Sequence, residues 1–147
     1  MSISLQSRRL ALPESNSQAL KQGALNLAQH SERLLDYPSS RGDEGLRKDI
    51  QRITPNWQGD VFITASATSA LSMSLKLIGE GKRIAVQVPA YFMIFDQIKS
   101  NKQELLTWET IDELEALGKV DAIITTSNHR PPSSVSLSTN DKKAIAE

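Results

Sequence analysis

The sequence predicts an α/β fold built on a mostly parallel sheet with helices on both faces. Beyond Pro55, short β-branched segments alternate with segments whose apolar residues recur at helical spacing. Parallel strands need crossover connections, and helical crossovers then cover both faces of the sheet. The runs at 84–88 and 122–124 are almost wholly apolar, which is typical of strands buried on both sides. A chain of 147 residues can bury one modest core.

The first part of the chain is predicted to be an irregular lead-in followed by two helices. Apolar residues recur at helical spacing in both helices, and Ser15 or Asn16 is the expected N-cap of the first. Gly42 lies in the turn-rich linker between them and is expected to adopt a positive φ. The segments are the lead-in at 1–13, a helix at 14–35, the linker at 37–42 and a helix at 43–53, with Leu46, Ile50 and Ile53 on one face.

The remainder of the chain is predicted to alternate strands and helices. Pro89 cannot donate a ladder hydrogen bond and should end a strand. Gly79 and Gly81 should end a helix, and Ser138 should cap the last one. The expected strands lie at 61–64, 83–88, 104–108 and 121–126, and the expected helices at 67–78, 91–99, 111–117 and from Ser138 to the end of the sequence.

Composition and charge exclude several classes of function. The 17 basic and 17 acidic residues give a formal net charge of zero, so we expect no nucleic-acid partner and no membrane partner. The sequence has no cysteine, and its two histidines, His30 and His129, have no ligand neighbours at metal spacing, so we expect no metal site. Apolar runs are too short to cross a bilayer. We expect a cytoplasmic location, with a transit peptide in the basic N-terminus as the alternative.

Candidate binding residues follow two of the predicted strands. Ligands of open α/β sheets bind at the carboxyl ends of the strands. Ser66, Ala67 and Thr68 begin a helix there, and the N–H groups at a helix N-terminus form an anion site to which hydroxyls can add hydrogen bonds. Serine is also a common N-cap that needs no ligand, so both interpretations stay open.

Aromatic and polar loop residues give further candidates. Tyr91 follows the next strand and could stack on a flat heteroaromatic ligand, or it could pack a helix onto the sheet with its neighbours. Tyr37 lies in a loop, where packing is the ordinary role of a tyrosine. The polar loop at 128–134 could contact a ligand or simply turn the chain before the last helix. The sequence contains no glycine-rich dinucleotide fingerprint and no phosphate-binding Gly-Lys-Ser/Thr motif.

The segments 37–47, 64–71 and 89–91, taken in order, resemble a known family. Their order and spacing are similar to those of the N-terminal half of the large domain in fold-type I pyridoxal-phosphate (PLP) enzymes, the class I/II aminotransferases. The resemblance is strongest to the aminotransferase-like domains of MocR-type regulators. It implies an N-terminal lead-in and helix over 1–36 and a partial PLP-binding large domain over 37–147.

The resemblance implies a cofactor site with residues from three places in the chain. Ser66, Ala67 and Thr68 match the small-residue turn that holds the PLP phosphate, although Ser66 stands where a glycine is common. Tyr91 matches the aromatic residue that stacks on the pyridine ring. Tyr37 matches a tyrosine that reaches the cofactor phosphate of the neighbouring subunit, so the resemblance also implies a dimer.

The sequence departs from the family in two respects. The segment that usually reads Asn-Pro-Thr-Gly matches the loop at 128–134, where Pro131 takes the place of the asparagine and Asn128 lies three residues upstream. The family's Schiff-base lysine, its aspartate on the pyridine nitrogen and its substrate-binding arginine would all lie beyond Glu147. We therefore expect no catalytic residue in this sequence and weak or absent PLP binding.

Three functional hypotheses follow. The first is a truncated or split PLP-dependent aminotransferase-like protein that does not catalyse amino-group transfer by itself. The alternative is a non-enzymatic oligomerisation or interaction module derived from the same fold, because half of such a sheet leaves an open strand edge. The third is an unrelated α/β domain. The first two predict as partner either a second copy of the chain or a companion chain carrying the C-terminal half.

Overall fold

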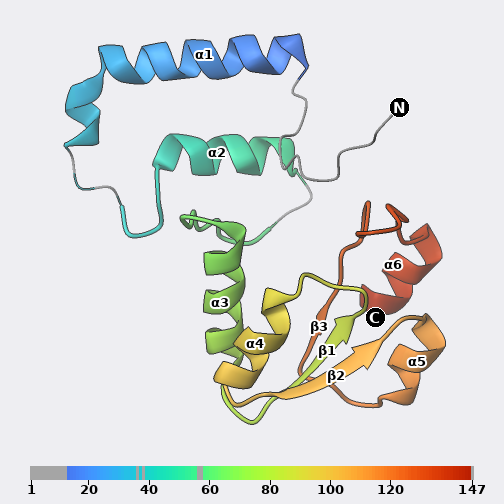
Figure 1. Ribbon diagram of the computed structural model, residues 1–147. Helices are drawn as coiled ribbons and strands as arrows, with labels where there is room; N and C mark the ends of the chain where they lie inside the picture. Colours follow the sequence, from blue (N-terminus) through green and yellow to red (C-terminus); the bar gives the residue numbers. More distant parts are fainter. Residues whose placement is uncertain (1–12, 36, 38, 56–57, 147) are drawn as a thin grey trace, which may run out of the picture. The chain divides into compact units, whose positions relative to one another are not determined.

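The computed structural model describes residues 13–35, 37, 39–55 and 58–146. The chain divides into two compact units, Met1–Ile63 and Thr64–Glu147. The first unit contains α1 (Glu14–Gln29), the short 3-10 helix η1 (Ser31–Leu34) and α2 (Glu44–Ile53) (Figure 1). None of the described helices in either unit is long and apolar enough to cross a membrane.

Helix α1 begins at the predicted residue, Glu14, but ends at Gln29, and η1 takes up the last part of the helix predicted at 14–35. Its N-cap is Pro13, so the expectation that Ser15 or Asn16 caps it was wrong. The Pro13 carbonyl accepts hydrogen bonds from the N–H groups of Asn16 and Ser17, which places these residues inside the first turn. Helix α2 begins where expected, because Asp43 caps it by accepting from the N–H of Leu46 at 2.8 Å.

The chain packs tightly on itself where the linker after η1 meets the segment after α2. Gly42 has a φ of 92°, as predicted, and a Cβ added to it would lie 2.5 Å from the Cβ of Ile63. The N–H of Ile63 donates to the carbonyl of Arg41 at 3.0 Å. The predicted strand at 61–64 is wrong, because no strand of the described chain forms a ladder with it.

The second unit has the predicted α/β architecture. Its three strands are parallel in the order β2-β1-β3, so β1 is central. Each element begins and ends within about three residues of its predicted position. The elements are α3 (Ala67–Ile78), β1 (Arg83–Gln87), α4 (Met93–Ser100), β2 (Glu104–Trp108), α5 (Ile111–Ala116), β3 (Ala122–Ile124) and α6 (Thr139–Ala146).

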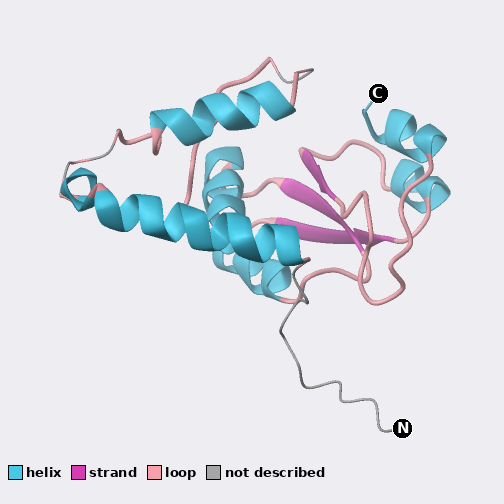
Figure 2. Ribbon diagram, turned by 90° about the horizontal axis from the view of Figure 1, so that it is seen from above, coloured by secondary structure: helices cyan, strands magenta, loops and turns pink. Residues whose placement is uncertain are grey.

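Helices cover both faces of this sheet, which confirms the predicted fold class (Figure 2). Alternate residues of β1 point to opposite faces. Ile84 and Val86 join a buried cluster with α3 and α4 on one face, whereas Ala85 joins a second cluster on the other. The other buried members are Leu75, Ile94 and Ile98 in the first cluster, and Trp108 and Leu114 in the second.

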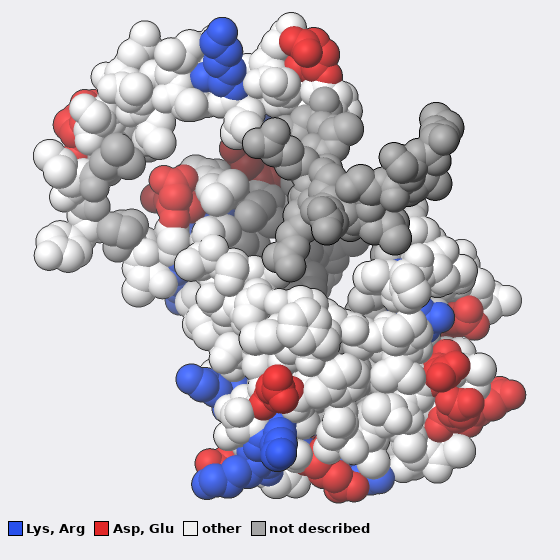
Figure 3. Space-filling model, viewed as in Figure 1, with Lys and Arg blue, Asp and Glu red and all other residues white. Residues whose placement is uncertain are grey.

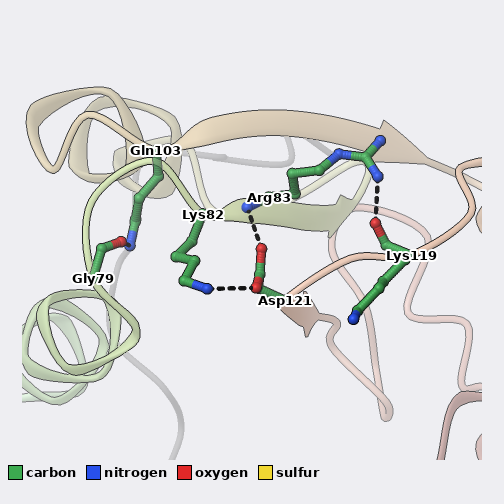
Figure 4. Close-up of polar contacts among 6 residues, drawn as sticks. All are labelled: Gly79, Lys82, Arg83, Gln103, Lys119 and Asp121. Atoms are coloured by element: carbon green, nitrogen blue, oxygen red, sulfur yellow. Dashed lines mark hydrogen bonds and ion pairs between the residues drawn. The ribbon is translucent and has the colours of Figure 1, made fainter.

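Side chains at the amino ends of the strands tie the sheet together (Figure 4). Asp121, just before β3, accepts hydrogen bonds from the Lys82 ammonium at 3.0 Å and from the backbone N–H of Arg83 at 2.9 Å. The Arg83 guanidinium donates to the carbonyl of Lys119. The bond from the Arg83 N–H, followed by that from Lys82, holds the pKa of Asp121 below its ordinary value of 3.8.

Gln103 joins the start of β2 to the end of α3. Its side chain is buried, and its Nε2 donates to the carbonyls of Leu75 at 2.7 Å and Gly79 at 2.8 Å. These carbonyls lie at the C-terminal end of α3, where the Leu75 carbonyl also accepts from the N–H of the C-cap Gly79 at 3.3 Å. The amide thus supplies the hydrogen bond of the Gly79 carbonyl and a second one to the Leu75 carbonyl.

Replacing this amide should destabilise the unit. The Gln103→Leu variant keeps most of the side-chain volume but removes the donor to the Gly79 carbonyl and one of two donors to the Leu75 carbonyl, so we expect the free energy of unfolding to fall by about 1–3 kcal/mol. Urea denaturation measures the change. Gln51→Leu, on the exposed side of α2, is the control and should change stability by less than about 0.5 kcal/mol. Equal changes in the two variants would contradict the capping role.

The Asp121 contacts should make stability depend on acid pH. A carboxyl whose pKa is lowered by folding stabilises the folded state above its ordinary pKa, and that stabilisation disappears as the pH falls through the lower folded-state value. Asp121→Asn should therefore melt at a lower temperature than the wild type near pH 7. The difference should shrink as the pH falls below 3.8. Thermal melts across this pH range measure the difference in melting temperature between the two proteins. A difference that does not vary with pH would contradict the role given to the Asp121 carboxylate.

Candidate functional site

A hollow of about 170 Å³ lies at the carboxyl ends of β1 and β3, within the second unit. This is the edge of a parallel α/β sheet where ligands bind. Its walls are mostly apolar and come from α3, the start of α4 and the two strand ends. We call it the Tyr91 hollow, and its lining residues are Leu71, Gln87, Ala90, Tyr91, Ile94, Ile124, Thr125 and Thr126.

Tyr91 lies at the rim of this hollow, after the carboxyl end of β1, as the sequence predicted. It follows β1 in the turn before α4, and its carbonyl accepts from the N–H of Ile94 at 3.0 Å. The side chain is 51% exposed, and the buried cluster beneath α4 includes Phe95 but not Tyr91. Its ring centroid lies 5.2 Å from that of Phe92, which is also exposed. The buried side chains of Ile94 and Ile98 pack α4 onto the sheet, and half of the Tyr91 side chain is accessible to a ligand.

The start of α3 has the geometry of a capped helix. Ser66 is in an extended conformation, its Oγ accepts from the N–H of Ser69 at 3.1 Å, and its carbonyl accepts from that of Ala70 at 3.0 Å. The N-cap interpretation of Ser66 is therefore confirmed. The N–H groups of Ala67 and Thr68 precede the first bond of the helix and have no acceptor within it. These two N–H groups are therefore available to an anion, in addition to the cap that Ser66 provides.

The start of α3 and the Tyr91 hollow are about one helical turn apart. Thr68 and Leu71 are three residues apart on α3, so their side chains lie on the same face, with a rise of about 4.5 Å between them. Leu71 lines the hollow, whereas Ser66, Ala67 and Thr68 do not. The structure thus brings the predicted phosphate-binding turn and the predicted stacking tyrosine to one side of the sheet.

Two polar residues of the hollow were not anticipated from the sequence. Gln87, only 3% exposed, ends β1, and its Oε1 accepts from the Thr125 hydroxyl at 2.5 Å. Its Nε2 donates to the carbonyl of Glu109 at 3.3 Å. The amide thus connects the residues that follow both neighbouring strands. The sequence signal was a glutamine inside an otherwise apolar strand, at 84–88.

The loop at 128–134 contributes no residue to the Tyr91 hollow. Asn128 is exposed, and its Oδ1 accepts from the Lys142 ammonium of α6 at 2.9 Å. Arg130 pairs with Val135 in an antiparallel bridge that folds the loop back, with Pro131 exposed between them. Asn128 is therefore bonded to α6 and does not line the Tyr91 hollow.

The remaining candidates are Tyr37 and the two histidines, His30 and His129, none of which lines this hollow. Tyr37 belongs to the first unit, where its side chain is fully exposed. Among the described residues, no group of three or more histidine or acidic side chains could hold a metal ion, which includes the surroundings of His30 and His129.

No protein-family model matches the chain, and a search of curated proteins found no match. The assignment of a function therefore depends on the geometry and chemistry of the residues themselves.

The cap at Ser66 gives a direct test of this local geometry. Ser66→Ala removes the side-chain acceptor for the Ser69 N–H, so the free energy of unfolding should fall by about 1 kcal/mol. Ser66→Gly should cost only a few tenths of a kcal/mol. Urea titrations of both variants measure the difference, and Ser72→Ala in the same helix is the control. An alanine variant as stable as the wild type would contradict the capping bond.

Proposed function

We propose that residues 37–147 are the N-terminal part of the large domain of a PLP-dependent aminotransferase-like protein. The carrying observation is that Tyr91 borders a hollow at the carboxyl edge of the sheet, one helical turn from the free N–H groups of α3. A phosphate and an aromatic ring on one small molecule match these two features. We propose the cytoplasm as the location of this protein.

The residues present fit a part of the cofactor. The N–H groups of Ala67 and Thr68, with the Thr68 hydroxyl, would hold the phosphate at the positive end of α3. Tyr91 would lie against the pyridine ring, a contact worth about 1 kcal/mol beyond the burial of its surface. The hydroxyls of Thr125 and Thr126 line the same hollow and can accept or donate hydrogen bonds to polar ring substituents.

The hollow is too small for a complete cofactor site. Its volume of about 170 Å³ is below the roughly 300–1,000 Å³ of ordinary ligand pockets. No lysine lines it. Bound PLP supplies an electron sink for chemistry at an amino-bearing carbon, but the proposal assigns these residues only to binding. A second copy or a companion chain would complete the site, and Tyr37 is exposed in the first unit and thus accessible to such a partner.

A specific observation favours the interaction module as the second candidate. Neither α1 nor α2 contains a buried residue. Large apolar side chains of the first unit are exposed instead: Leu20, Leu25, Leu27, Ile53 and Phe62. In the second unit β2 and β3 form the edges of the described sheet, and open edges favour pairing with another chain. A partner that covers these surfaces would account for them without any cofactor.

A thermal melt with pyridoxamine phosphate tests the primary proposal. This amine form cannot condense with surface lysines, so any stabilisation reports binding to the folded chain. A ligand at a hundredfold excess over its Kd stabilises the folded state by about 2.7 kcal/mol. We expect the melting temperature to rise with pyridoxamine phosphate and not with inorganic phosphate. A cooperative melt that does not move would instead support the interaction module, for which sedimentation would detect the oligomer.

Matched variants assign the binding to the residues named. Tyr91→Ala and Thr68→Ala should each weaken pyridoxamine-phosphate binding about fivefold, since each removes a contact worth about 1 kcal/mol. Phe92→Ala, the exposed aromatic next to Tyr91, and Ser74→Ala on the same helix as Thr68 should bind as the wild type does. If all four variants bind equally, the site assignment is wrong even where the wild type binds.

A further inference from the structure

A second hollow, of about 330 Å³, lies on the face of the second unit that α5 and α6 cover. Trp108 and Ile111 line it, and both belong to the buried cluster on that face, whereas the Tyr91 hollow adjoins the cluster beneath α3 and α4. We call it the Arg130 hollow. It is lined by Gln87, Trp108, Glu109, Thr110, Ile111, Asp112, Arg130, Val135, Ser136, Leu137 and Asp141.

The charged side chains of this hollow do not neutralise one another. Among the described residues, no ion pair involves Arg130, Asp112 or Glu109. The Arg130 guanidinium is half-buried, and its recorded hydrogen bond is a long one of 3.4 Å to the carbonyl of Val88. Asp141 uses one oxygen to accept from the N–H of Ser138. A half-buried guanidinium without a carboxylate therefore shares a hollow with three carboxylates.

The loop after β3 fixes the position of Arg130. Its N–H donates to the carbonyl of Val135 at 2.9 Å, and its carbonyl accepts from the N–H of Ser134 at 2.7 Å. Two of the acidic side chains come from helices, with Asp112 in the first turn of α5 and Asp141 in that of α6. Acidic side chains also gather over the surface of α5 (Figure 3). The positive and the negative side chains of the hollow thus come from different elements of the structure.

One residue of the lining, Trp108, has a buried polar atom without a hydrogen-bond partner among the described residues. Trp108 is 1% exposed, and its indole Nε1 finds no acceptor among the described residues. Such orphaned donors are rare in folded proteins and cost free energy. Trp108 also places a fluorescent ring in the lining, next to the apolar side chains of Ile111 and Leu137.

We propose that the Arg130 hollow binds a small zwitterion, with its carboxylate on Arg130 and its ammonium group between Asp112 and Asp141. Charge decides among the ligand classes. The lining carries one positive and three negative side chains, so an anion alone would enter an unfavourable field. A cation alone would leave the guanidinium unpaired. A metal ion is disfavoured because no described group of acidic side chains has suitable geometry. The inference does not depend on a PLP site.

Equilibrium dialysis of the full chain against labelled ω-amino acids tests the proposal. The series runs from glycine to 6-aminohexanoate, which covers the range of charge separations that the hollow could span. Butyrate and butylamine are the controls that carry one charge each. Two charge-assisted contacts should give at least one member of the series a Kd of about 1 mM or lower. Both single-charge controls should bind at least about tenfold more weakly.

Variants locate the binding in this hollow. Arg130→Gln and Asp112→Asn should each weaken binding at least about tenfold. Lys99→Gln and Asp96→Asn, on exposed positions of α4, remove the same charges elsewhere in the unit and should leave binding unchanged. Asp112 is at the surface and has no ion pair, so its variant tests the site even if Arg130→Gln disturbs the loop. In a Trp57→Phe background, a change in Trp108 fluorescence on binding would place the ligand beside the indole.

Three results would overturn the proposal. The first is no saturable binding by any member of the series. The second is equal binding of the zwitterions and the single-charge controls. The third is equal affinity in Asp112→Asn and Asp96→Asn. None of these results bears on the Tyr91 hollow, so the proposal and the PLP assignment fail independently.

Discussion

Burial of the central strand on both sides is the constraint on which the second unit depends. Every residue of β1 from Ile84 to Gln87 is buried, so each backbone polar group must find its partner in a neighbouring strand. Both edges of β1 are accordingly paired, with β2 on one side and β3 on the other. Burying an isoleucine or valine side chain contributes about 1.5–3 kcal/mol, and this gain requires helices on both faces. The arrangement of helices on both faces of the sheet therefore follows from the burial of β1.

The same constraint separates the two hollows. Side chains that alternate along β1 direct one buried cluster toward α3 and α4 and the other toward α5. At the end of the strand Gln87 lines both hollows, bonded to Thr125 on one side and to the Glu109 carbonyl on the other. A polar side chain at this buried position is stable because both ends of its amide are satisfied.

The sequence was most informative where a local signal and the hydrophobic pattern agreed. Ser66 and Ser138 predicted helix starts because their hydroxyls cap helices locally, and Pro89 marked the end of β1. The strand expected at 61–64 failed because a strand also needs a partner, which a local pattern cannot supply. In the site, Tyr91 and the start of α3 were foreseen, but the bond between Gln87 and Thr125 joins residues 38 positions apart and depends on the tertiary fold.

The hydrogen bonds of Gln103 have a consequence for the order in which the unit assembles. The helix that offers its N-terminal N–H groups at one end is held at its other end by a side chain 28 residues further along. During synthesis, α3 therefore leaves the ribosome well before the residue that secures its last turn. Domains form their structure as units while the chain emerges. The orientation of α3 is thus completed only when β2, the third element after it, begins to pair, and the position of its N-terminal end is set at the same time.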